Sequence, residues 1–343
     1  MKSGILIVNL GTPAAPRTPE VARYLRQFLM DPAVIDIAAP LRFFFVNVLI
    51  VPRRAPKSAE AYAKIWTERG SPLLFHSLDL CDRLRERLSV PVELAMRYGE
   101  PSIATGLGAL VKTGCERVLV APLYPQFATS STTSSLTEVH ACLARTRNAP
   151  AIDVLPPFYD DARFLDAFAA VGRPVLDGLR PEHVLFSYHG LPERHVTKLD
   201  RSGGAHCLAR PDCCERIVEA NRDCYRAHCF ATTRGLRARL GLDERTSTIS
   251  FQSRLGRTPW IRPFTDHVVP ELARRGVKRL AVFCPSFVAD CLETLEEIGI
   301  RARADFRAAG GEELALVPSL NAHAKWVEGL SAMLAERLRA SER

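Results

Sequence analysis

The chain has 343 residues, of which 47% are hydrophobic and 24% charged, a composition typical of a globular protein that is long enough for two domains. Its formal charge of +8 favours anionic partners, but the arginines are scattered and no basic run alternates with aromatic residues, which excludes nucleic acid as the expected partner. Because no signal peptide or membrane-spanning stretch is present, we expect a cytoplasmic protein whose ten cysteines are thiols or metal ligands.

Taken in chain order, three apolar strand patterns in the first half return in the same order in the second half. The paired strands end alike, first in Gly and Pro, then in Arg, then in Pro, and helical patterns lie between them. Strands that alternate with helices predict an α/β protein with two similar domains, each built on a parallel sheet. The paired patterns lie at 4–13 and 184–192, at 92–97 and 248–254, and at 114–125 and 276–285.

We expect the domain boundary near the proline-rich stretch 150–157. This predicts a first domain over 1–152, a second over 153–318 with an insert at about 201–230, and a C-terminal helix within 319–343 that packs back on the first domain. In two such domains the ligand site lies between facing strand ends. Its expected walls are Asn9, Arg97 and Tyr124 on one side, and His189, Arg254 and Pro285-Ser286-Phe287 on the other.

Two features of the second wall indicate that it could carry out chemistry. His189 follows a short apolar strand and precedes a Gly190–Pro192 turn, and strand ends of this kind are where open α/β sheets bind ligands. After Pro285, three carboxylates spaced three and four apart would share one helical face: Asp290, Glu293 and Glu297. They form either a solvated acidic face or, opposite an imidazole, a site for a divalent cation or a proton relay. We predict that Glu293 faces His189.

The motifs ILIVNLGTP (5–13), LYPQFATSSTTSSL (123–136), SYHGLP (187–192), FQSRLGRTPWIRPFTD (251–266) and ADCLETLEEIG (289–299) resemble those of ferrochelatases over almost the whole chain. The resemblance implies the chelatase fold, with two Rossmann-like domains whose parallel sheets carry helices on both faces. It also implies insertion of Fe²⁺ into a porphyrin, most similar to the protoporphyrin IX type, with release of two protons. His189 would be the active-site histidine and Glu293 its acidic partner, both also able to bind the iron, and Asp290 and Glu297 would lie on a carboxylate path for protons or metal. The positions that match the family's pocket are Leu10, Arg97, Tyr98, Tyr124, Trp260 and Phe287.

Five of the ten cysteines fall within the insert, which we call the cysteine-rich segment (residues 201–230). Four thiolates can hold Zn²⁺ or a [2Fe–2S] cluster, and the spacing does not match a zinc ribbon. Some ferrochelatases carry a [2Fe–2S] cluster, and this chain resembles bacterial members whose ligands lie in an internal segment. We therefore predict a cluster held by four of five cysteines, with Cys213 or Cys214 as the spare one: Cys207, Cys213, Cys214, Cys224 and Cys229.

The stretch Leu41–Pro52, which we call the apolar lip, is LRFFFVNVLIVP, and Arg53, Arg54 and Lys57 follow at once. It predicts either a core helix or strand, or a peripheral contact with the inner face of an anionic membrane. Other readings of the whole chain stay open: a chelatase for another metal or for coproporphyrin III, a tetrapyrrole carrier without chemistry, or an iron–sulfur sensor. Whether His189 first takes protons or binds iron, and whether the protein is a monomer or a homodimer, are left open as well.

Overall fold

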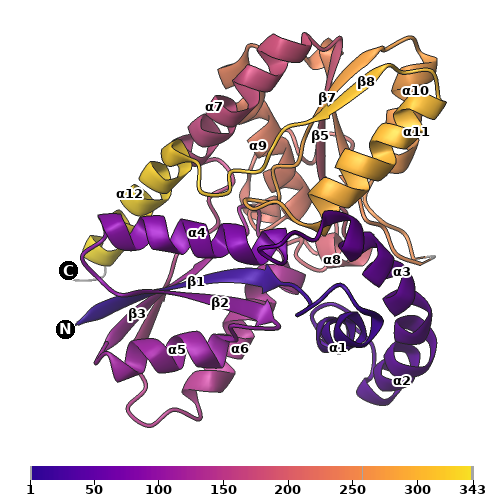
Figure 1. The fold of residues 1–343 in the computed structure, drawn as a ribbon. Helices are drawn as coiled ribbons and strands as arrows, with labels where there is room; N and C mark the ends of the chain where they lie inside the picture. The colour runs from indigo at the N-terminus through magenta and orange to yellow at the C-terminus, as the bar shows by residue number, and fades with distance from the viewer. Residues whose placement is uncertain (1, 257, 341–343) are drawn as a thin grey trace. The chain divides into compact units, whose positions relative to one another are not determined.

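The computed structural model describes residues 2–256 and 258–340. The chain divides into two compact units, each built on one four-stranded sheet (Figure 1). Unit 1 comprises the chain up to Tyr124, Thr129–Pro156 and the residues from Val327 on, and unit 2 comprises Pro125–Ala128 and Pro157–Trp326. All strand pairs within the two sheets are parallel.

The sheet of unit 1 has the strand order β2-β1-β3-β4, with β1 at its centre. Because β1 is covered on both sides, its central residues Ile5–Val8 are all apolar and buried rather than alternating, as expected for a buried parallel strand. The register pairs Gly11 with Tyr98, so the ends of the two strands meet at one edge of the sheet. The strands are β1 (Ser3–Gly11), β2 (Val92–Tyr98), β3 (Arg117–Pro122) and β4 (Ala151–Val154).

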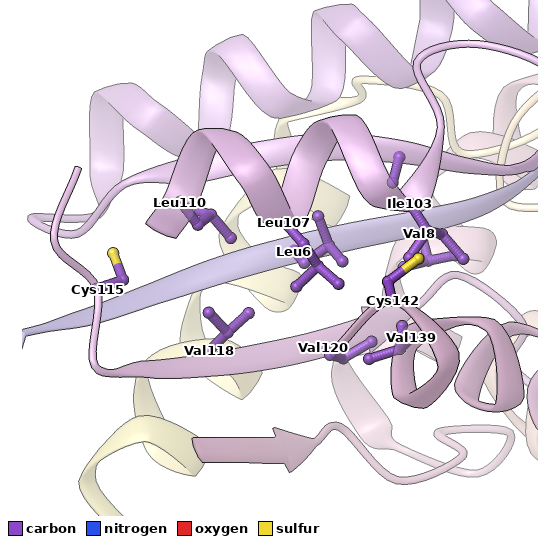
Figure 2. Close-up of a cluster of buried hydrophobic side chains, with 11 residues drawn as sticks. Leu6, Val8, Ile103, Leu107, Leu110, Cys115, Val118, Val120, Val139 and Cys142 are labelled. Atoms are coloured by element: carbon purple, nitrogen blue, oxygen red, sulfur yellow. The ribbon is translucent and has the colours of Figure 1, made fainter. Parts of the chain in front are cut away.

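Helices cover both faces of this sheet. Figure 1 shows α4 on one face and α5 with α6 on the other. In Figure 2, Leu6 and Val8 of β1 and Val118 and Val120 of β3 lie against the side chains of α5 and α6. Burial of each such side chain stabilises the folded state by about 1.5–3 kcal/mol relative to leaving it exposed. The helices of this unit are α1 (Thr18–Leu29), α2 (Ala39–Phe44), α3 (Val51–Ile65), α4 (Pro72–Arg87), α5 (Ile103–Lys112) and α6 (Ser134–Leu143).

Unit 2 repeats the arrangement, with the strand order β6-β5-β7-β8. Figure 1 shows α7 and α9 on one face of the sheet and α10 and α11 on the other. The core beneath α10 and α11 is built around Val282 and Phe306. The elements are β5 (His183–His189), β6 (Ser247–Gln252), β7 (Arg279–Phe283), β8 (Glu313–Leu316), α7 (Ala162–Leu179), α8 (Glu193–Thr197), η3 (Glu219–Asn221), α9 (Tyr225–Leu240), η4 (Glu244–Thr246), α10 (Thr265–Arg274) and α11 (Arg303–Ala308).

The equal strand orders confirm the predicted fold class and the internal duplication: β1, β2 and β3 correspond to β5, β6 and β7. The stretch at 150–157 forms β4 as well as the passage from Pro156 of unit 1 to Pro157 of unit 2. The last helix, α12 (Ala324–Ala340), begins in unit 2, where Trp326 packs on Phe158 and Phe164. From Val327 on it belongs to unit 1.

In the part of the chain that the structure describes, three stretches have the wider π-helical turn. This turn is rare in proteins overall, but where it occurs it is frequently at a functional site. They are η1 (Phe45–Ile50), η2 (Thr129–Thr133) and η5 (Glu293–Ala302). The first lies in the apolar lip and precedes Pro52, which has no N–H to donate to the preceding turn. The lip is therefore helical, but it is not a core helix, because Phe43 and Phe44 expose 61% and 50% of their surface. None of the helices in the described part of the chain is long and apolar enough to cross a membrane.

Candidate active site

His189 is the last residue of β5 and is only half-buried. Its Nδ1 lies 2.6 Å from the carbonyl oxygen of Gly190. Because a carbonyl can only accept, Nδ1 must carry the proton, and in the neutral ring Nε2 then carries the lone pair. The ring of Phe287 lies edge-on to the imidazole at a centroid distance of 6.2 Å. The fold therefore presents a lone-pair nitrogen beside an aromatic ring at the edge of the sheet.

The turn after His189 can only be made by glycine. A Cβ on Gly190 would lie 2.7 Å from the carbonyl oxygen of Gln252 and 3.3 Å from the ring of Trp260. Trp260 is held in turn, because its Nε1 donates to the carbonyl of Leu255 at 2.9 Å and its backbone bridges to Pro192. The motif SYHGLP and residues 258–260 thus form one local structure, in which the indole of Trp260 lies against Gly190, the residue next to His189.

The acidic segment differs in part from the predicted helical face. Asp290 lies before the helix, not on it, and its carboxylate accepts from Thr294, from Asn321 and from the backbone N–H of Ser319. Glu297 accepts from the backbone N–H and the hydroxyl of Ser253 at 2.9 and 2.5 Å. Both carboxylates therefore have fixed structural partners.

Glu293 is the first residue of η5 and is half-buried. The neighbouring Cys291 has its pKa raised well above the ordinary value, by burial first and then by the charge of Glu293 and a hydrogen bond to it. His189 and Glu293 both adjoin Gln252, which pairs in register with His189 and donates from Nε2 to the carbonyl of Glu293 at 2.8 Å. The carboxylates of Asp290 and Glu297 thus have structural roles. The backbone of Glu293, by contrast, is hydrogen-bonded to Gln252, the residue that pairs with His189 across the sheet.

In unit 1, Arg97 and Tyr98 end β2 and belong to a closed polar network. Arg97 Nη2 and the Tyr98 hydroxyl both donate to Asp31 Oδ2, at 2.6 and 2.9 Å, and the Ser134 hydroxyl donates to the same oxygen at 2.6 Å. Burial alone would raise the pKa of Asp31, but the hydrogen bonds from Ser134, Ala33 and Tyr98 and the charge of Arg97 outweigh it and hold the pKa below the ordinary value. We call these four residues, Asp31, Arg97, Tyr98 and Ser134, the Asp31 network.

This network changes the meaning of two expected pocket residues. Arg97 is paired with Asp31 and only 13% of its side chain is exposed, so its charge is largely neutralised within unit 1. Tyr98 is fully buried and does not line an open surface. Leu10 and Tyr124 are half-buried in unit 1, and the Tyr124 hydroxyl lies 3.1 Å from that of Ser135. Sequence reasoning missed Asp31, Ser134 and Gln252, although Gln252 stands inside the motif FQSR.

The five thiols of the cysteine-rich segment are all buried. Cys213 Sγ and Cys214 Sγ lie 3.7 Å apart, and Cys224 is hydrogen-bonded to both Cys207 and Cys214. Cys229 lies further along α9 and is hydrogen-bonded to Tyr225 instead. Within residues 2–256 and 258–340, no group of three or more His, Cys, Asp or Glu side chains is arranged to hold a metal ion. The thiols therefore touch in pairs without converging on one point.

Two neighbours shape this segment. Arg226 Nη1 donates to Cys214 Sγ at 3.0 Å and lies 3.8 Å from Cys213 Sγ. Asp200 accepts from Ser202, from the N–H of His206 and from the N–H of Cys207, which orders the turn that leads into the first cysteine. Burial raises the pKa of Cys207 to about 11, so this side chain is a thiol at neutral pH until a metal displaces its proton.

The fold defines the class of protein first. The solved structure of SirB from Bacillus subtilis with Fe³⁺ has a TM-score of 0.57 at 15% identity, over 100% of this chain and 98% of that chain. The sirohydrochlorin chelatase SirB from Bacillus subtilis subspecies spizizenii in complex with cobalt has a TM-score of 0.55 at 13% identity, over 100% and 97%. The chain thus has the chelatase fold.

The sequence then names the family, because the ferrochelatase family model matches residues 2–338. The curated ferrochelatase of Pseudomonas fluorescens (strain Pf0-1) is 49% identical over 335 residues, which are 97% of each chain. That of Azotobacter vinelandii is 50% identical over 336 residues, 96% of this chain and 97% of the relative, and that of Coxiella burnetii (strain Dugway 5J108-111) is 45% identical over 340 residues, 98% and 94%. The chain belongs to the ferrochelatase family.

Proposed function

We propose that this protein inserts Fe²⁺ into protoporphyrin IX to form protohaem, with release of the two pyrrole protons. The observation that carries the proposal is the close contact between Nδ1 of His189 and the carbonyl oxygen of Gly190, because this carbonyl accepts the Nδ1–H and so selects the tautomer of the ring. Nε2 is thereby left with the lone pair, at a half-buried strand end. A pyrrole N–H is a matching proton donor for that nitrogen.

The remaining roles follow from chemistry and burial. Glu293, half-buried and next to the segment of His189, would take up the proton from the imidazole or hold the incoming iron by its carboxylate. Phe287 and Trp260, both half-buried, offer ring faces and edges against a flat macrocycle. Because their carboxylates have internal partners, Asp290 and Glu297 would support this segment rather than carry free charge.

The test is anaerobic incubation of the purified protein with Fe²⁺ and protoporphyrin IX, following the loss of the free-base porphyrin spectrum. Catalytic turnover supports the proposal. Binding of porphyrin without metal insertion would indicate a tetrapyrrole carrier. Parallel reactions with coproporphyrin III and with Co²⁺ test the other chelatase activities, and a strong preference for either would overturn the stated substrate.

We also propose a [2Fe–2S] cluster in the cysteine-rich segment. The donor set fits chemically, since four buried thiols are linked in pairs and a tetrahedron with metal–sulfur bonds of about 2.3 Å has edges close to the 3.7 Å between Cys213 and Cys214. The contacts favour Cys207, Cys213, Cys214 and Cys224 as ligands, with Cys229 as the spare cysteine in place of Cys213 or Cys214, which the sequence analysis expected. Because no three of these side chains converge, ligation requires them to turn from this arrangement. Arg226, which donates to Cys214, would tune the reduction potential.

Protein isolated without oxygen should be coloured and contain about two irons and two labile sulfides per chain, the composition of that cluster. Cys224→Ser should remove the colour. The matched control is Cys81→Ser, which alters an equally buried thiol of unit 1. Colourless protein with bound zinc would refute the cluster in favour of a structural zinc site.

We also propose that the protein is cytoplasmic and contacts the inner face of the membrane through the apolar lip. Leu41, Phe43, Phe44, Phe45 and Val48 are exposed, and Arg53, Arg54 and Lys57 follow on α3. Apolar side chains beside basic ones suit an anionic bilayer surface. The double variant Phe43→Ser/Phe44→Ser should bind anionic vesicles more weakly than wild type and raise the KM for porphyrin more than that for Fe²⁺. Leu78→Ser, which alters an exposed apolar residue outside the lip, is the control. If wild type fails to co-sediment with such vesicles at low salt, the membrane contact is wrong.

A further inference from the structure

Three segments of unit 2 meet at one buried side chain, that of Gln252, which ends β6 and is 2% exposed. Its Nε2 donates to the Glu293 carbonyl at 2.8 Å, and its Oε1 accepts from the Ser187 hydroxyl at 2.7 Å. The backbone carbonyl of Gln252 accepts from the backbone N–H of Gly190 at 2.8 Å. We infer that Gln252 is a positioning residue for iron insertion, which sets the location of Glu293 relative to His189. This inference rests on the proposed function.

The orientation of the amide follows from its partners. The Glu293 carbonyl can only accept, so the nitrogen of the amide must face it, and the oxygen must face β5 and β7. On that side Ser187 donates, and Cys284 lies at 3.8 Å. Because each hydroxyl has one proton, the chain Ser250, Thr265, Ser187 is oriented with every donor pointing toward Gln252. Only a side chain with a donor and an acceptor on one planar group satisfies both sides.

The place of these bonds explains why they bear on the reaction. Gly190 immediately follows His189, and it is bound by the backbone of Gln252. Glu293 begins the π-helix, and its backbone is bound by the side chain of the same residue. One residue thus connects the backbone next to His189 with the backbone of Glu293. A misplacement of about 1 Å between reacting groups can lower a rate about 100-fold.

The test is a double-mutant cycle with Gln252→Met, which keeps the length of the side chain but removes donor and acceptor. We expect kcat to fall about 10- to 100-fold, no more than in Glu293→Gln, with the KM for protoporphyrin IX within a few-fold of wild type. If Gln252 acts through Glu293, Gln252→Met/Glu293→Gln should be no more than about threefold slower than Glu293→Gln alone. Rates are measured in single turnover with protein in excess, so that slow variants stay measurable. Multiplication of the two losses would overturn the inference, because it would indicate independent effects.

The control is Thr248→Val, which removes a side-chain hydrogen bond to His183 at the opposite end of the same strand pair. It should retain the wild-type kcat. If Gln252→Met does not fold, Gln252→Glu serves instead, since it keeps shape and acceptor but loses the donor to Glu293, and a wild-type kcat in that variant would overturn the inference. Wild-type turnover is measured first, so absence of iron insertion in the wild type refutes the proposed function and not the positioning role.

Discussion

The carboxyl edges of the two sheets have the same strand order but opposite chemistry. In unit 1, β2 ends in Arg97 and Tyr98, and Asp31 pairs with both within a network that also includes Ser134. In unit 2, the corresponding strand β6 ends in the neutral Gln252, and the adjacent β5 ends in a half-buried imidazole. Equal topology therefore does not imply equal function. At the edge of unit 1 the charged side chains pair with one another, whereas at the edge of unit 2 the imidazole of His189 can act as a base.

The largest effect should come from breaking the pairing in unit 1. Asp31→Ala removes the close anion of the buried Arg97 guanidinium and leaves only Glu138 at 3.7 Å, so we expect a loss of about 3–5 kcal/mol in the free energy of unfolding, measured with urea. The matched control is Glu93→Ala on the same strand, whose partner Arg85 is exposed, and there we expect less than about 1 kcal/mol. Equal losses in both variants would show that burial of the Asp31 network does not matter.

Next in size is the loss of the base in unit 2. His189→Ala should lower the rate of iron insertion about 10²- to 10⁴-fold, the usual contribution of a positioned proton acceptor, while the unfolding midpoint stays close to that of wild type. His183→Gln, at the other end of β5, should keep the wild-type rate. A folded His189→Ala protein with near-normal turnover would remove the imidazole from the mechanism.

A smaller effect should separate the carboxylates of η5. Glu293→Gln keeps the shape but removes the charge beside the His189 segment, so we expect the rate to fall about 10- to 100-fold. Glu297→Gln retains an amide that can still bond to Ser253, so its rate should stay within about tenfold of wild type. Should Glu297→Gln prove the slower of the two in single-turnover assays, the carboxylate roles would have to be exchanged.

The smallest effect is a pH dependence confined to unit 1. The pKa of Asp31 is lower in the folded than in the unfolded protein, so its contribution to stability is complete above the unfolded value of about 4 and is lost as pH falls through the folded value. The difference in unfolding midpoint between wild type and Asp31→Asn should therefore be constant from about pH 7 to 5 and shrink below about pH 4. A difference that instead grows in acid contradicts the lowered pKa.

Much of the site could be predicted from the sequence because it depends on local order. An apolar run that ends in His189 and Gly190 specifies a buried strand and a turn by short-range physics, and the turn places the imidazole at the edge. The apolar lip was ambiguous for the same reason: its composition fits either a core or a surface helix. Only its packing left Phe43 and Phe44 exposed.

By itself, the sequence determined the α/β class, the repeated succession of strand patterns along the chain and the family, because alternating strand and helix patterns and the motifs are properties of contiguous residues. Tertiary structure alone decided the partners. Asp31 and Arg97 are 66 residues apart, and Gln252 and Glu293 are 41 apart, so no local spacing marks either pair. The hydrogen bonds from Asn321 to Asp290 and from Ser253 to Glu297 likewise join residues that are far apart in the chain. Hydrogen-bond partners are chosen by what folding brings within about 3 Å, and that is a property of the packed chain.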